Sequence, residues 1–167
     1  LEIQNDIKKS RIWFYNDFLN WTNSLPVDKV FIIGGNHDFF LEHLLEENVM
    51  KDSPHKEIVH EILFDDEYKL QYIFDTIKYK SKDGNEYTIK TIPCIEDCNG
   101  WAFNEKDYVV RATCEVVFNE HFDILLSHDT PDIIPFSNNW GGNELAKGIK
   151  NAMIHNKYPN YWFFGHI

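Results

Sequence analysis

The chain has 167 residues, a length typical of one domain of moderate size. Hydrophobic residues make up 43% of the chain and the aromatic residues comprise 13 Phe, 8 Tyr and 5 Trp, which excludes intrinsically disordered and fibrous proteins. A formal net charge of −11 argues against a protein that binds long nucleic acids or an anionic membrane surface through charge. A small anionic substrate stays possible, because a bound metal ion can invert the local field.

Local sequence patterns predict an α/β domain in which helices alternate with short strands and a mixed sheet forms. Apolar residues recur with a helical period in the helices, and β-branched and aromatic runs mark the strands. The Asp83-Gly84 pair predicts the turn of a hairpin. In chain order the predicted elements are a helix over 3–23, a strand buried on both faces over 30–33, helices over 39–47 and 55–63, hairpin strands over 72–79 and 87–92, a helix over 105–119, a strand over 122–127, a helix over 142–155 and a strand over 161–164. We expect a single domain over residues 1–167.

The three cysteines are Cys94, Cys98 and Cys114, an odd number without a Cys-x-x-Cys pair. We interpret them as reduced thiols of an intracellular protein, with a leftover thiol of a secreted protein as the alternative. No apolar run reaches the roughly 20 residues that a membrane-spanning helix needs, and no signal peptide opens the chain. We therefore expect a cytoplasmic protein without a membrane partner.

Three predicted strands each end in a histidine. The segments that follow the strands are Gly34-Gly35-Asn36-His37-Asp38, Ser127-His128-Asp129 and Gly165-His166. Ligands bind beyond the carboxyl ends of strands in open α/β sheets, so parallel neighbours would bring these side chains into one crevice. Imidazole nitrogens and amide oxygens suit Zn²⁺, Mn²⁺ and Fe²⁺, and glycine lets another group approach the backbone closely. One histidine after a strand is more often a loop residue with a hydrogen bond, so the hypothesis of a metal site depends on all three occurring together.

These segments resemble the motifs of the calcineurin-like metallophosphoesterases. Gly35-Asn36-His37-Asp38 is similar to the Gly-Asn-His-Asp/Glu motif, Leu125-Leu126-Ser127-His128 to the later strand-end histidine, and Phe164-Gly165-His166-Ile167 to the closing Gly-His-x-His. A narrower likeness is to the small class III phosphodiesterases called metallophosphoesterase-domain-containing proteins. Its residues are Pro93, Trp101-Ala102-Phe103-Asn104, His128-Asp129-Thr130-Pro131 and Gly142-Asn143-Glu144-Leu145.

The resemblance implies a four-layer α/β/β/α sandwich with mixed sheets and a metal-dependent phosphodiesterase with two divalent ions (Mn, Fe or Zn). By matching position, Asn36, His128 and His166 would be ligands of the second metal. His37 would contact the phosphate and protonate the leaving oxygen, and Asp38 would orient His37. A hydroxide that bridges the metals would attack the phosphate in line. The implied substrate is a small phosphoester such as a cyclic nucleotide, with no long nucleic acid as partner.

Two motifs of the family have no match in this sequence. The chain contains no Asp-x-His and no Gly-Asp, which supply the other metal and the bridging carboxylate, and the closing histidine would follow Ile167. We therefore expect a section of a longer protein, trimmed on both sides, rather than a degenerate relative. The alternatives are a nuclease of the same family and a catalytically inactive binding module. Trp101 and Phe103 are interpreted as core or pocket wall rather than as platforms for base stacking.

Overall fold

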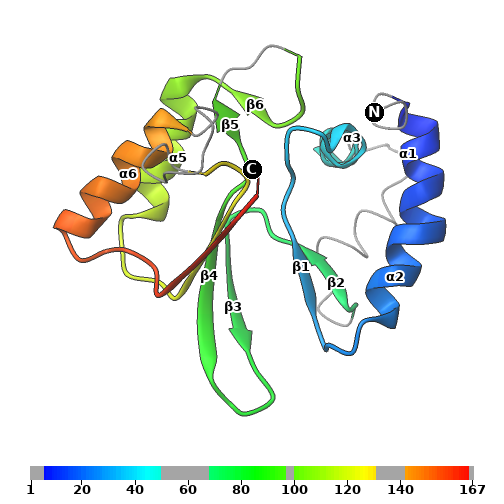
Figure 1. Cartoon of the computed structure of the whole chain (residues 1–167), viewed down its shortest axis with the longest axis horizontal. Helices are drawn as coiled ribbons and strands as arrows, with labels where there is room; N and C mark the ends of the chain where they lie inside the picture. Colours follow the sequence, from blue (N-terminus) through cyan, green and yellow to red (C-terminus); the bar gives the residue numbers. More distant parts are fainter. Residues whose placement is uncertain (1–5, 50–67, 97–99, 131–141, 166–167) are drawn as a thin grey trace.

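Helices and strands alternate along the chain in the computed structural model, which describes residues 6–49, 68–96, 100–130 and 142–165 (Figure 1). The elements are α1 (Ile7–Trp13), the π-helical segment η1 (Phe14–Phe18), α2 (Leu19–Ser24), β1 (Val30–Ile32), α3 (Phe39–Val49), β2 (Leu70–Tyr72), β3 (Thr76–Lys80), β4 (Glu86–Ile92), β5 (Ile95–Glu96), β6 (Asn104–Glu105), α5 (Asp107–Val117), β7 (Ile124–Ser127), α6 (Asn143–Ile154) and β8 (Tyr161–Phe164). The mixed α/β class predicted from the sequence is confirmed.

The largest sheet has four strands in the order β3-β4-β7-β8. Strands β3 and β4 form the predicted antiparallel hairpin, whereas β4, β7 and β8 run parallel. The register aligns the last residues of these three strands, with Ile92 opposite Ser127 and Ser127 opposite Phe164. The carboxyl ends of all three strands therefore lie at the same end of the sheet, which a crevice shared by the residues after them requires.

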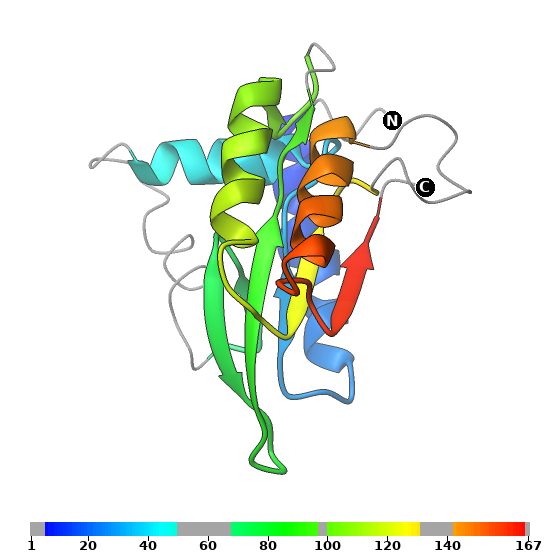
Figure 2. The ribbon, with the colours of Figure 1, turned by 90° about the vertical axis from the view of Figure 1, so that its left-hand side faces the viewer.

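Helices cover the strands from two sides, and each side has its own apolar core. Helices α5 and α6 lie on one face of the four-stranded sheet (Figures 1 and 2). Phe122, Leu125 and Val110 belong to the core between them. On the other side of the molecule, α1, η1 and α3 pack against β1 and β2, and Phe14 and Tyr72 lie in that core. Burial of apolar surface, worth about 25 cal/mol per Å², stabilises both groups of elements.

The prediction that residues 30–33 form a strand buried on both faces was wrong. The strand β1 has three residues, and all of them are only half-buried. Among the described residues β1 pairs with β2 alone, in a parallel sheet of two strands. The strand therefore lies at the edge of its sheet, where its residues are less covered than residues between two neighbouring strands.

The predicted strand over 72–79 is interrupted. Strand β2 ends at Tyr72 and β3 begins at Thr76, because the chain changes partner from β1 to β4 between them. The backbone N–H of Thr91 in β4 donates to the carbonyl of Asp75 at 2.9 Å and holds the bend. The two-residue strands β5 and β6 were not predicted, and the predicted helix over 55–63 lies outside the described residues.

Cys94 and Cys114 are free and buried, and burial raises the pKa of Cys94 to about 11 and that of Cys114 to about 12. Both thiols therefore stay protonated at neutral pH. Cys98 lies outside the described residues. Within the ranges that the structure covers, no helix has the length and apolar character needed to cross a membrane.

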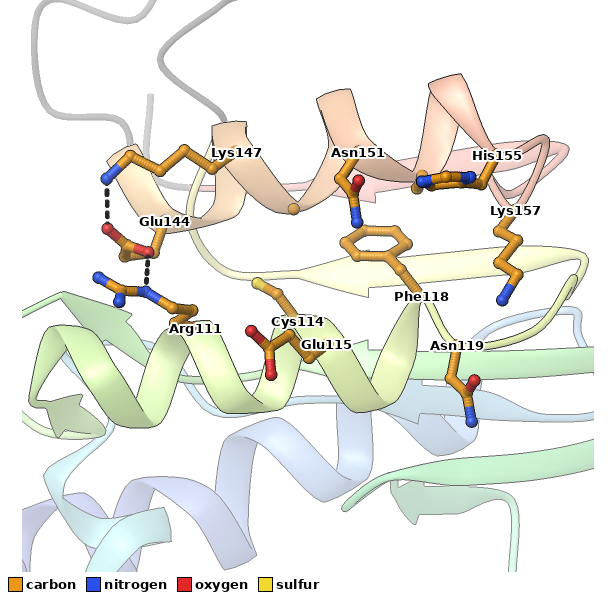
Figure 3. A pocket seen from close by; sticks show the side chains of 12 residues that line it. Arg111, Cys114, Glu115, Phe118, Asn119, Glu144, Lys147, Asn151, His155 and Lys157 are labelled. Atoms are coloured by element: carbon orange, nitrogen blue, oxygen red, sulfur yellow. Dashed lines mark hydrogen bonds and ion pairs between the residues drawn. The ribbon is translucent and has the colours of Figure 1, made fainter.

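A buried carboxylate connects the two helices that cover the four-stranded sheet. Glu144, at the start of α6, accepts hydrogen bonds from Arg111 Nε in α5 at 2.7 Å and from Lys147 Nζ at 2.5 Å (Figure 3). The Glu144 side chain is only 4% exposed. The hydrogen bonds from Arg111 and Lys147 lower the pKa of Glu144 from 4.5 to about 2. The Glu144 backbone N–H also donates to the carboxylate of Glu96, which satisfies one of the open amides at the start of α6.

The Glu144 ion pairs predict a specific loss of stability in acid. Because the folded-state pKa is lowered, the stabilisation is complete above pH 4.5 and is lost as the pH falls toward 2. We expect Glu144→Gln to lower the free energy of unfolding at pH 7 by about 1 kcal/mol, since both cations are largely exposed. Urea unfolding at a series of pH values should show this difference closing below pH 4.5. A difference that stays constant down to pH 2 would contradict the role of these ion pairs. The control is Glu115→Gln, which alters an exposed glutamate in the groove between α5 and α6 that Glu144 also lines.

Candidate functional site

The loop over residues 34–38 connects β1 to α3 and carries three of the predicted site residues. Two reciprocal hydrogen bonds close it: the Gly35 N–H donates to Asp38 Oδ2 at 2.8 Å, and the Asp38 N–H donates to the Gly35 carbonyl at 2.9 Å. The Asp38 carbonyl then accepts from the N–H of Glu42 at 3.0 Å, so α3 begins directly after the loop. These hydrogen bonds and the start of α3 therefore fix the backbone of the loop.

Asn36 and His128, which are 92 positions apart in the sequence, meet at this loop. Asn36 Oδ1 lies 2.9 Å from His128 Nε2. Asn36 is only 5% exposed, and its backbone carbonyl accepts from the N–H of Ala102 at 3.1 Å. The structure thus brings together two of the three predicted metal ligands.

His128 lies where the parallel strands end. Its backbone N–H donates to the carbonyl of Ile92 at the end of β4, and its carbonyl accepts from the N–H of Gly165 after β8, each at 3.2 Å. The preceding residue, Ser127, accepts from Trp162 Nε1 at 2.8 Å, so the strands on both sides hold this segment. The third predicted ligand, His166, lies outside the described residues, but the chain just before it runs against His128.

Gly34 and Gly35 allow aromatic rings to approach the backbone of the loop closely, as the sequence pattern predicts. A Cβ atom on Gly35 would lie 2.5 Å from His128 Nδ1, and a Cβ atom on Gly34 would lie 2.1 Å from Cζ of Phe103. Both distances are far too short for two atoms that are not bonded. Any larger residue at position 35 would push the imidazole of His128 away from Asn36.

His37 and Asp38 occupy the outer part of the loop, and both are exposed. The His37 ring packs against the indole of Trp101, with 4.6 Å between the ring centroids and an angle of 76° between the planes. The pKa of Asp38 is raised, because the surrounding protein desolvates its carboxyl although one side of the residue faces solvent. The Gly35 N–H and the charge of His37 oppose this shift. Asp38 therefore both fixes the loop and interacts electrostatically with His37.

Asp129, directly after His128, carries a buried carboxyl group to which the sequence patterns assign no function. Asp129 is 6% exposed, and burial together with the negative charge of Glu96 raises its pKa to about 7, against the effect of a hydrogen bond from the Glu96 backbone. Its position directly after His128 was visible in the sequence, but the neighbouring Glu96 comes from β5, a strand that no pattern predicted.

The spacing of Asn36 Oδ1 and His128 Nε2 is compatible with two ligands of one divalent ion. Two ligands about 2.1 Å from one ion and at right angles to each other are about 3 Å apart. The observed 2.9 Å is the length of a hydrogen bond from His128 Nε2 to Asn36 Oδ1, and it is close to that spacing. The amide oxygen and the imidazole nitrogen are both ligand types for such an ion, which would take the place of the Nε2 proton. No group of three or more His, Cys, Asp or Glu side chains able to hold a metal occurs among residues 6–49, 68–96, 100–130 and 142–165. Within these ranges, Asn36 and His128 are the two predicted ligands that the structure brings together.

Comparisons with known proteins give no further information on this site. No family model matches the sequence, and no curated protein matches it. The chemistry open to the site therefore follows from its own side chains. One amide oxygen and one imidazole nitrogen can bind a divalent ion, and a second, exposed imidazole on the same loop can transfer a proton.

Gly35 offers a direct test of the geometry around His128. We expect Gly35→Ala to lower the free energy of unfolding by about 1–3 kcal/mol, because the new methyl group overlaps the His128 ring. The matched control is Gly165→Ala, whose Cβ would make an ordinary contact of 3.7 Å with the same ring and should change stability by less than about 0.5 kcal/mol. Urea unfolding of both variants measures the difference. Equal stabilities would show that Gly35 is not needed for close packing.

Proposed function

We propose that this chain is part of a metal-dependent phosphodiesterase domain of the calcineurin-like metallophosphoesterase family. The observation that supports the proposal most strongly is the 2.9 Å contact between Asn36 Oδ1 and His128 Nε2. In that family the corresponding asparagine and histidine bind the same metal. The proposed architecture is the family's four-layer α/β/β/α sandwich. The helices that flank the four-stranded sheet and the β1-β2 sheet in Figure 1 are compatible with it.

Asn36 and His128 would hold the metal, with His166 as a third ligand by resemblance. The donors suit Mn²⁺, Fe²⁺ or Zn²⁺, and the intact domain would bind two such ions. When bound, the metal supplies Lewis acidity, which polarises a phosphoryl oxygen and lowers the pKa of a water molecule. The Ala102 N–H fixes Asn36 through its backbone, and the neighbouring strand ends fix His128, so neither ligand has to be ordered when the ion binds.

His37 would act on the leaving group. It follows Asn36 directly and is exposed, so a phosphoester near the two ligands comes within reach of its ring. A protonated imidazole there donates a proton to the oxygen that leaves phosphorus. The net charge of −11 favours a small phosphoester such as a cyclic nucleotide over a long nucleic acid.

Metal binding can be tested with Mn²⁺ alone by isothermal titration calorimetry. We expect Asn36→Ala and His128→Ala each to weaken Mn²⁺ binding by more than about tenfold, since even the outer partners of metal ligands contribute about 10- to 100-fold. The control His155→Ala alters an exposed histidine at the end of α6 and should bind Mn²⁺ as the unaltered chain does. Equal affinities for all variants would contradict the proposed ligands.

The role of His37 can be tested in the intact domain by hydrolysis of bis(p-nitrophenyl) phosphate with Mn²⁺ present. We expect His37→Ala to lower kcat by about 10²- to 10⁴-fold, the usual contribution of general acid–base catalysis, and to leave Mn²⁺ binding unchanged. Loss of Mn²⁺ from this variant would instead make His37 a ligand. Faster hydrolysis of single-stranded DNA than of a cyclic nucleotide would favour a nuclease. No turnover and no Mn²⁺ binding by the unaltered intact domain would favour an inactive binding module.

A further inference from the structure

We infer that Trp101 is a positioning residue that fixes the orientation of the His37 ring; the catalytic consequence of this inference rests on the proposed function. The indole and imidazole rings are 4.6 Å apart and meet edge to face at 76°. Edge-to-face packing of two rings is favourable only over a limited range of angles, so it restricts rotation of the smaller ring. His37 is exposed on a loop, so the contact with the Trp101 ring restricts the rotamers that the imidazole can adopt.

Trp101 is itself held in place by the segment around it. Ala102 is fully buried, and its N–H donates to the carbonyl of Asn36 at 3.1 Å. The N–H of Phe103 donates to Glu42 Oε1 in α3 at 2.5 Å, while the Phe103 carbonyl accepts from the N–H of Ile95 at 3.0 Å. The segment 101–103 is therefore attached both to the loop that carries Asn36 and His37 and to α3.

The backbone of this segment turns so that the two aromatic side chains point to different parts of the loop. Phe103 has a φ of +52°, a left-handed conformation that non-glycine residues rarely adopt. Its ring covers Gly34, whereas the Trp101 ring lies against His37 and also stacks on Phe39 with a centroid distance of 6.4 Å. The Trp101 ring thus contacts the rings of both His37 and Phe39, which are two residues apart in the chain.

Trp101 remains 38% exposed, although its ring is large and apolar. A residue needed only for the core would be buried further, as Ala102 beside it is. The position of the indole at the rim, in contact with the proposed proton donor, is expected for a residue that acts through His37. A fixed imidazole matters for catalysis because a displacement of about 1 Å of a reacting group can cost about 10²-fold in rate.

The experiment compares Trp101→Leu, which removes the ring, with Trp101→Phe, which keeps an aromatic ring. Trp21→Leu is the matched control, because Trp21 is 55% exposed on α2 and packs on Phe18 instead. In the intact domain with Mn²⁺ and bis(p-nitrophenyl) phosphate, we expect Trp101→Leu to lower kcat by about tenfold or more with KM and Mn²⁺ affinity unchanged. Trp101→Phe should retain most of the kcat, and Trp21→Leu all of it.

A second readout does not depend on activity. In NMR spectra of the chain with labelled histidines, the three-bond couplings about χ1 of His37 should move toward rotamer-averaged values in Trp101→Leu, less in Trp101→Phe and not at all in Trp21→Leu. A higher KM with unchanged kcat would overturn the inference and make Trp101 a substrate contact, and unchanged His37 couplings would overturn it outright. If no variant hydrolyses the ester but the His37 couplings change as expected, the proposed function fails while the positioning of His37 by Trp101 stands.

Discussion

The contact between Asn36 and His128 is the interaction on which the candidate site depends. It joins the loop after β1 to the segment after β7, and so links the two-stranded β1-β2 sheet to the four-stranded sheet at the carboxyl ends of their strands. Burial of a polar amide costs free energy unless the amide is paired, and Asn36 is 5% exposed. The His128 ring and the Ala102 N–H supply partners for the Asn36 side chain and backbone. The fold therefore pairs this buried amide with an imidazole, a side chain that is also able to bind divalent ions.

Several independent features keep the contact in place. The register of β4, β7 and β8 sets the position of His128, and the reciprocal hydrogen bonds between Gly35 and Asp38 set that of Asn36. The absence of a side chain at Gly35 lets the two approach each other. On the outer side of the sheet, the ion pair between Arg111 and Glu144 joins α5 to α6, so the helix packing uses other side chains than the candidate site does.

The sequence predicted those parts of the site that a local pattern encodes. The strands around 124–127 and 161–164, the histidines at their ends and the need for glycine at 34 and 35 were all visible as short runs with a clear physical meaning. The half-exposed state of β1 could not be predicted, because an apolar run does not show how many neighbours a strand will have. The same holds for the segment that carries Trp101. The strands on either side of it have two residues each, too few for a periodic signal, and its contact with His37 joins positions 64 residues apart.

The most direct test of the site is to follow Mn²⁺ addition by NMR in a chain labelled with ¹⁵N and ¹³C, since a paramagnetic ion broadens the signals of nearby nuclei. We expect the side-chain amide of Asn36 and the ring of His128 to broaden first, at Mn²⁺ concentrations below that of the protein. Asn151 and His155, in the groove between α5 and α6 (Figure 3), should stay sharp. Sharp Asn36 and His128 signals at equimolar Mn²⁺, with broadening elsewhere, would show that this pair does not bind the ion.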